Sequence, residues 1–310
     1  MTPKQIRFIE VGPRDGLQNW PATLATASKL AMVRALAQAN VTLIELTSMV
    51  SPARVPQLAD AEALVSAVLL ELAAERVRVL VPNLKGLERA LESGARHVLV
   101  NVGVTEDFNH RNLNRSVGAT LAEIARIASL ADAQGVRVDA SISVAWGCPF
   151  QGQVEAEQVL SVARECAQVG CRELSLADTI GVATPTSVAN LCSRVLDELP
   201  GSELSVHFHD SRGLGLANLM TALECGITTF EASVGGIGGC PFAPRSTGNI
   251  CSEEALFMLD PTVYQHDVDV SAMVRAAQLT SELLESDLPG RLYRAGLPWW
   301  TAEGARLEPS

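Results

Sequence analysis

Residues 204–210, with the sequence Leu-Ser-Val-His-Phe-His-Asp, indicate both how this chain folds and where its chemistry lies. Side chains alternate between the two faces of a strand, so Ser205, His207 and His209 face one way and the apolar residues between them face the other. Two imidazoles on one face of a strand can bind a single divalent cation, with carboxylate or amide oxygens completing the set. A pair of hydrogen-bonded strand histidines is the alternative. Asp210 follows at once and ends the strand, so any further ligands must arrive at its carboxyl end.

Length and composition describe a globular protein. The chain has 310 residues, of which 47% are hydrophobic and 19% charged, values typical of a folded chain without disorder. Its net charge of −11 argues against a nucleic-acid partner, because phosphate backbones require clustered Lys and Arg. The seven cysteines are irregularly spaced, which fits a reduced compartment. No secretory or transit pattern opens the chain and no long apolar run follows, so we expect a cytoplasmic protein with no membrane partner.

Apolar, β-branched runs alternate with amphipathic or Ala/Leu-rich stretches along the chain. We expect strands over residues 6–11, 42–46, 78–81, 97–102, 137–144, 173–176, 204–209 and 229–234. We expect helices over residues 25–39, 55–73, 84–92, 116–133, 155–169, 184–199, 213–225 and 252–258.

Eight strand-helix units predict an α/β fold, a TIM (β/α)8 barrel over residues 1–260. A doubly wound open sheet is the structural alternative. Residues 261–310 are predicted to form a C-terminal helical extension that packs on the barrel, with helical patterns over 271–285 and 289–293. Trp299 and Trp300 are too apolar to lie in water without a partner.

Several rim loops of the predicted barrel carry residues suited to catalysis, because barrel active sites lie at the carboxyl ends of the strands. Arg14 and Asp15 follow the first strand, Glu45 lies near the end of the second, and Asp178 ends the sixth. A surface ion pair, a loop anchor and a helix N-cap are their ordinary structural roles.

The loop after the eighth strand, residues 235–249, is rich in glycine and proline, a composition typical of a lid. It carries Cys240, whose thiol can donate a proton or act as a nucleophile if neighbours tune its pKa. A simple long connection is the alternative. Cys148, after the fifth strand, is a second rim thiol to which we assign no role.

Six motifs occur in the order and spacing of one known family. They are Val-Gly-Pro-Arg-Asp-Gly-Leu-Gln-Asn (11–19), Ser-Met-Val-Ser-Pro (48–52), Pro-Asn-Leu-Lys-Gly (82–86), Asp-Thr-Ile-Gly (178–181), His-Phe-His-Asp (207–210) and Gly-Cys-Pro-Phe-Ala (239–243). Together they resemble the 3-hydroxy-3-methylglutaryl-CoA lyase family, part of a metal-dependent lyase and aldolase group. The resemblance implies a TIM barrel that cleaves the carbon-carbon bond of a 3-hydroxy-3-methylglutaryl-CoA-type ester to acetyl-CoA and a 3-keto acid, as in leucine degradation.

The resemblance also implies residue roles. It implies a cation, Mg²⁺ or Mn²⁺, held by the positions that match the family's ligands: Asp15, His207, His209 and Asn249. Four residues match catalytic positions, with Arg14 neutralising an enolate oxygen and Cys240 transferring a proton: Arg14, Glu45, Asp178 and Cys240. We expect the substrate, an acyl-CoA thioester, to be contacted by Arg14, Gln18, Arg212 and Arg245.

Departures from the family pattern concern the substrate. Trp20, Asn101, the segment 109–112, Arg212 and the segment 244–247 differ from what the family usually carries, whereas the matched metal and catalytic positions do not. We therefore hypothesise an acyl substituent larger or more acidic than methyl. A Claisen-type synthase or aldolase with the same metal site, and a non-catalytic scaffold, are the alternatives. From the length of the stretch after the barrel we expect no regulatory domain of the kind that such synthases carry, and we expect a homo-oligomer, a dimer or tetramer.

Overall fold

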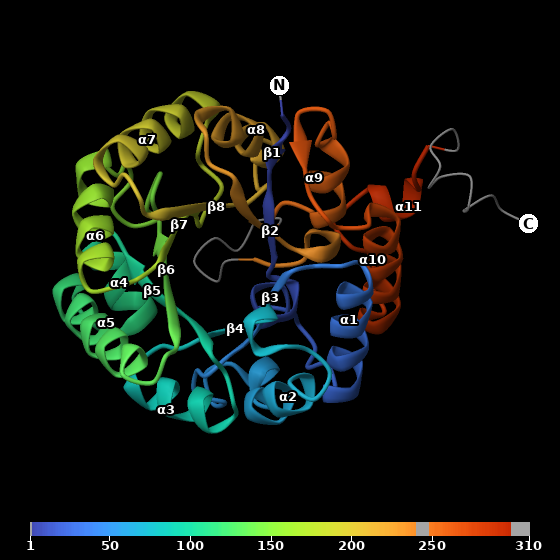
Figure 1. The fold of residues 1–310 in the computed structure, drawn as a ribbon, viewed down its shortest axis with the longest axis horizontal. Coiled ribbons are helices and arrows are strands. Elements are labelled where there is room, and N and C mark those ends of the chain that lie inside the picture. Colours follow the sequence, from blue (N-terminus) through green and yellow to red (C-terminus); the bar gives the residue numbers. More distant parts are fainter. Residues whose placement is uncertain (1, 240–247, 299–310) are drawn as a thin grey trace, which may run out of the picture.

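The barrel closes as the strand pattern predicts. The computed structural model describes residues 2–239 and 248–298, and within them eight parallel strands form a closed barrel in chain order (Figure 1). These strands are β2 (Arg7–Glu10), β3 (Leu43–Ser48), β4 (Val77–Leu80), β5 (His97–Gly103), β6 (Arg137–Ser143), β7 (Glu173–Asp178), β8 (Glu203–Phe208) and β9 (Thr229–Ala232). Because β2 also pairs with β9, the TIM barrel is confirmed and the open sheet is excluded.

Helices surround the barrel (Figure 1). Their bounds are α1 (Thr26–Gln38), α2 (Ala61–Val68), α3 (Leu84–Glu92), α4 (Glu106–Leu113), α5 (Val117–Asp132), α6 (Ala156–Gln168), α7 (Pro185–Glu198), α8 (Gly215–Cys225), α9 (Ser252–Met258), α10 (Val270–Leu284) and α11 (Leu292–Ala295). Several begin at a side-chain cap, as where Asn83 accepts from Gly86 N and Ser116 from Ala119 N, which satisfies backbone donors that a helix start leaves unpaired.

Three helical segments differ from the prediction. Helix α4 was not predicted, although Thr105 accepts a bond from Phe108 N and two acidic residues follow it, as at many helix starts. The stretch 55–73 contains only a short turn, Pro56–Leu58, and α2. Helix α11 begins later than residue 289 because the carboxylate of Glu254 caps the backbone N–H groups of Arg291 and Leu292.

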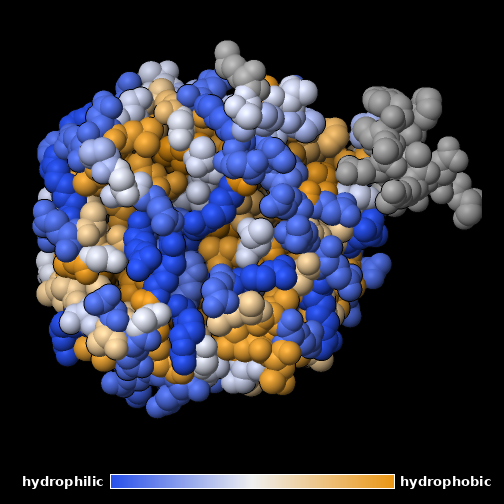
Figure 2. Space-filling model, in the orientation of Figure 1, coloured by the Kyte–Doolittle hydropathy of each residue, from blue (hydrophilic) through white to orange (hydrophobic). Residues whose placement is uncertain are grey.

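Strand β8 has a polar face toward the barrel interior and an apolar face that packs against the helices. On β8, Val206 and Phe208 belong to the apolar core, while Ser205 donates to Glu173 and His207 contacts Glu231 inside the barrel. In the orientation of Figure 1, Figure 2 shows hydrophilic residues over the centre of this face, with hydrophilic and hydrophobic residues mixed around them. On β8 the predicted alternation therefore separates an apolar outer face from a polar inner face.

The residues that follow the barrel pack against it. Strand β1 (Lys4–Gln5) pairs with β10 (Tyr264–Gln265), and α10 packs beside α1 and α9 (Figure 1). Trp299 and Trp300 lie outside the described residues. None of the helices in the described part of the chain is both long and apolar enough to cross a membrane.

Candidate metal centre and active site

Three side chains from distant parts of the chain meet at the carboxyl ends of the strands. His207 is on β8 and His209 follows it, with ring centroids 5.2 Å apart. Asp15 comes from the π-helical turn Gly12–Gly16 after β2, whose Asp15 N donates to Val11 O at 2.7 Å. Each residue offers one ligand atom, and these atoms lie within 4.8 Å of one another. The two histidines and the carboxylate therefore face a common point.

Asn249 brings an amide to the same point. Its backbone pairs with His209 in an isolated bridge, and its Nδ2 donates to Asp15 Oδ2 at 2.8 Å and to Ile237 O at 3.1 Å. A Cβ on Gly238, whose φ is +143°, would lie 2.5 Å from that Nδ2, so only glycine allows this close approach. Asn249 Oδ1 is buried and has no hydrogen-bond partner among the described residues.

A buried acceptor without a donor is costly unless something satisfies it. Asn249 contacts Asp15 through Nδ2, and its unpaired Oδ1 is an oxygen donor of the type that binds divalent cations together with imidazole and carboxylate. The donor set thus fits a divalent cation. Because imidazole and carboxylate are shared by ligand sets for several metals, the set does not select one of them.

The charges around this cluster favour an ionised Asp15. Burial raises the pKa of the Asp15 carboxyl, but Arg14 and the two histidines outweigh it and hold the pKa below its usual value. Burial alone would lower the pKa of His207, yet the hydrogen bond from its Nδ1 to Glu231 raises it. Burial and the neighbouring His207 lower the pKa of His209 to about 4. His209 is therefore neutral at pH 7, the form that ligates metals.

Arg14 lies between two carboxylates at the edge of the cluster. Its Nε donates to Glu45 and its Nη1 donates to Asp15 Oδ1 at 2.7 Å. Both Arg14 and Glu45 are buried, and these bonds fix a guanidinium beside the three candidate ligands. Glu45 therefore contacts Arg14 directly. Within the described residues, no contact of Glu45 with Asp15, His207 or His209 is seen.

Asp178 is also at the rim but its oxygens are occupied. Oδ1 accepts from Val182 N at 2.9 Å and Oδ2 accepts from Ala183 N at 3.0 Å. Burial raises the pKa of this carboxyl even though both hydrogen bonds lower it. Asp178 holds the loop between β7 and α7. It is not the N-cap of α7, the structural role that the sequence left open, because Thr184 occupies that position.

The remaining predicted residues divide into three groups. Gln18 lines, with Arg14, a cavity of about 110 Å³ that also reaches Asp15, His207 and His209. Arg212 instead donates from Nη1 to Ile180 O at 2.9 Å and to Gly181 O at 2.8 Å, so it bridges two loops. Cys240 and Arg245 lie outside the described residues.

Sequence reasoning missed two sets of residues. Glu231 and Arg78 are charged groups inside β9 and β4, and a charge within an otherwise apolar strand was the available signal. The second set is a neutral polar wall of the cavity on β5, β6 and α4: Asn101, Asn112, Ser141 and Ser143. Asn101 donates to Ser143 Oγ at 2.8 Å. Of this set, the sequence singled out only Asn101 and the segment that contains Asn112.

A closed parallel barrel with two imidazoles, a carboxylate and an amide converging at its carboxyl rim defines a class of barrel enzymes built for a divalent cation. Residues 5–280 match the model of the HMGL-like family. The chain belongs to this family, which confirms the resemblance that the sequence motifs indicated.

Individual relatives cover nearly the whole chain. A lyase of Pseudomonas aeruginosa named for 3-hydroxy-3-isohexenylglutaryl-CoA and hydroxymethylglutaryl-CoA is 42% identical over 94% of this chain and 97% of its own. An (R)-citramalyl-CoA lyase of Chloroflexus aurantiacus is 38% identical over 94% of this chain and 95% of its own. A solved HMG-CoA lyase of Acinetobacter baumannii, in complex with coenzyme A and 3-methylmalate, has a TM-score of 0.90 and 32% identity, covering 94% of this chain and 95% of that one.

Proposed function

We propose that this protein is a divalent-metal-dependent carbon-carbon lyase that cleaves a 3-hydroxy-3-methylglutaryl-CoA-type ester to acetyl-CoA and a 3-keto acid, which is acetoacetate for the methyl compound. The observation that carries the proposal is the convergence of ligand atoms of Asp15, His207 and His209 within 4.8 Å, with the Asn249 amide in contact with Asp15. The names of the relatives, all acyl-CoA lyases, support the same reaction type.

In this proposal Asp15, His207, His209 and Asn249 hold Mg²⁺ or Mn²⁺. When bound, the cation supplies Lewis acidity that lowers the pKa of the substrate hydroxyl and orients the neighbouring carboxylate. A base then removes the hydroxyl proton, the carbon-carbon bond breaks, and the electron pair passes into the thioester fragment as an enolate.

Arg14 is suited to stabilise the negative charge that develops on the enolate oxygen. Its Nε and Nη1 are engaged by Glu45 and Asp15, so the guanidinium is fixed before the reaction, and Arg14 lines the candidate substrate cavity. Preorganised donors stabilise an oxyanion because they need not reorient. Glu45 supports Arg14, Asp178 supports the adjacent loop, and Cys240 is proposed to return the proton to the enolate carbon.

The substituent on the substrate is a separate part of the proposal. The names of two relatives include substrates other than the methyl compound. Arg212 is engaged by two loop carbonyls, whereas Asn101, Ser141 and Ser143 line the cavity. We therefore propose that this neutral polar wall, more than Arg212, selects the substituent, and that Arg245 remains a candidate from the sequence. A cytoplasmic location and a dimeric or tetrameric state stay predictions.

An assay with a panel of 3-hydroxyacyl-CoA esters tests the function. Purified protein with Mg²⁺ or Mn²⁺ should release acetyl-CoA from at least one ester, and Asp15→Asn should abolish the release. Release of a keto acid and acetyl-CoA identifies a lyase, whereas consumption of acetyl-CoA with a keto acid identifies a synthase. A wild-type protein that binds Mn²⁺ but turns over no member of the panel in either direction would contradict the proposal.

A further inference from the structure

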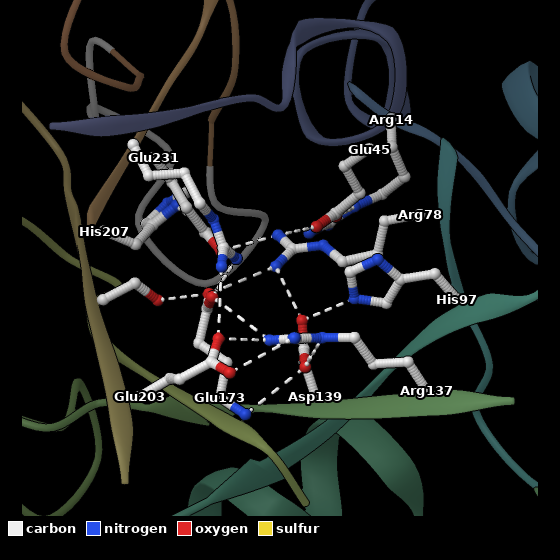
Figure 3. A network of polar contacts seen from close by, with 12 residues as sticks. Arg14, Glu45, Arg78, His97, Arg137, Asp139, Glu173, Glu203, His207 and Glu231 are labelled. Atoms are coloured by element: carbon white, nitrogen blue, oxygen red, sulfur yellow. Dashed lines mark hydrogen bonds and ion pairs between the residues drawn. The ribbon is translucent and has the colours of Figure 1, made fainter. Parts of the chain in front are cut away.

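A fully buried arginine lies on the barrel axis below the candidate site. Arg78, on β4, has no exposed surface, and its Nη2 donates both to Glu45 and to Glu231 Oε1, the latter at 2.6 Å. The two carboxylates come from β3 and β9, so one guanidinium nitrogen joins three strands of the barrel (Figure 3).

Each of these two carboxylates also contacts a residue of the candidate site. Glu45 uses its other oxygen to accept from Arg14 Nε, and Glu231 uses Oε2 to accept from His207 Nδ1 at 2.9 Å. With Arg78 donating to Oε1, Glu231 is an acceptor on both oxygens, so His207 Nδ1 carries a proton, and in the neutral imidazole the lone pair is on Nε2. That Nε2 lies 4.0 Å from Asp15 Oδ2.

We propose that Arg78 is a positioning residue that, through Glu231, sets the tautomer and direction of His207 and, through Glu45, holds Arg14, so that one buried cation aligns the candidate metal ligand with the candidate enolate partner. The proposal rests on the function proposed above. Figure 3 shows the chain of contacts, with Arg78 between Glu45 and Glu231 and with Arg14 and His207 beyond them.

The rest of the Arg78 guanidinium argues against a purely stabilising role. Its Nη1 is 3.8 Å from Asp139 and 3.7 Å from Glu173, and neither Nε nor Nη1 has a hydrogen-bond partner among the described residues. Unpaired buried donors are costly, and a buried ion pair is weak evidence for stability. The hydrogen bonds that Arg78 does make are to Glu45 and Glu231, the two carboxylates that also contact Arg14 and His207.

Binding of Mn²⁺ to the metal-free full-length protein, followed by calorimetry, tests this role. Arg78→Gln should weaken Mn²⁺ binding by about 10- to 100-fold, the usual effect of losing a group that orients a metal ligand. Arg78→Lys, which keeps the charge, should recover part of the affinity. The matched control is Glu173→Gln, which alters the Arg78 neighbour on the side away from the site and should leave Mn²⁺ affinity unchanged.

The ring nitrogens of His207 provide a second measurement. In ¹⁵N NMR spectra of the metal-free protein, recorded at a pH where the His207 ring is neutral, the wild type should show a single tautomer with the proton on Nδ1, and Arg78→Gln should show a mixture. If Arg78→Gln does not fold, Glu231→Asp, which retracts the same carboxylate without changing charge, should show the same weakening of Mn²⁺ binding.

Two results would overturn the proposal. One is Arg78→Gln with a lower melting temperature but wild-type Mn²⁺ affinity and His207 tautomer, which is a structural role alone. The other is an equal loss of Mn²⁺ affinity in Glu173→Gln. Failure of the proposed function is distinct, because a wild type that binds Mn²⁺ and cleaves no ester still reports on Arg78 through these measurements.

Discussion

The two ends of the barrel use the same kinds of residue in opposite ways. At the amino end, Arg137 donates to Asp139 at 2.8 Å and to Glu203 at 2.6 Å, and Arg7 contacts Glu173 and Glu203. At the carboxyl end, Asp15 and two imidazoles converge while Asn249 Oδ1 stays unpaired in the described part of the chain. One end neutralises its charges internally, and the other leaves ligand atoms directed to a shared point.

Cavity size alone would point to the wrong end. A hollow of about 940 Å³ lies at the amino end, lined by Arg7, His97 and Arg137, whereas the cavity over the candidate site is about 110 Å³. The charged groups of the larger hollow that face the axis are already paired. Since barrel chemistry is placed at the carboxyl ends of the strands, the difference teaches that the convergence of ligand atoms on one point identifies the site better than volume does.

Arg14→Gln should have the largest effect and should act on the reaction. Removing a preorganised charged donor costs about 10²- to 10³-fold in kcat, while KM changes less because the lost contact is made to charge that develops in the transition state. Steady-state kinetics with the best ester of the panel measure this. If kcat of Arg14→Gln is unchanged and only its free energy of unfolding falls, the charged groups at the carboxyl end are structural like those at the amino end, and the proposed difference between the two ends is wrong.

Arg137→Gln should act on stability alone. It removes a partly buried charge-assisted hydrogen bond to Asp139, which contributes about 1.5–3 kcal/mol to folding, and an exposed one to Glu203, which contributes about 0–1 kcal/mol. Urea unfolding should show that loss, and the stabilisation by Mn²⁺, about 2.7 kcal/mol at a concentration 100 times the Kd, should equal that of the wild type. A reduced response to Mn²⁺ in this variant would show that the two ends are not separate.

Glu10→Gln should have the smallest effect and should show that a carboxylate near the site is structural. Glu10 accepts from Gly12 N, Val234 N and Ser252 Oγ, yet burial raises its pKa from 4.5 to about 8. The folded carboxyl therefore keeps its proton up to about pH 8 while the unfolded one loses it above 4.5, so the free energy of unfolding falls as pH rises through that window.

The Gln variant keeps the three contacts without the proton, so its unfolding free energy should fall less steeply between pH 5 and 8. The difference in slope has an upper limit of about 1.4 kcal/mol per pH unit. Glu253, whose pKa burial raises to about 7, is present in both proteins and contributes to both slopes. Identical slopes in urea titrations across this range would show that Glu10 is already ionised in the folded protein.

Local pattern predicted most of the fold because the strands and helices carry their own periodicity. The eight strands lie within a few residues of their predicted positions, and α3 and α9 have the predicted bounds. Helix α4 was missed because its first turn is polar and its amphipathic pattern is short. Helix α11 was misplaced because Glu254, about 40 residues earlier, decides where it starts, and a local pattern carries no information on such a contact.

The sequence by itself determined the barrel, the family and the identity of the residues that gather at its rim, because strand alternation and motif spacing are local properties of the chain. Only the tertiary structure decided what each charge contacts. It showed that Asp178 holds a loop, that Arg212 bridges carbonyls, and that Arg78 links Glu45 to Glu231 across three strands. The physical reason is that barrel closure brings side chains from β3, β4 and β9 to one axis, where a buried charge must find its partner among residues far away in the chain.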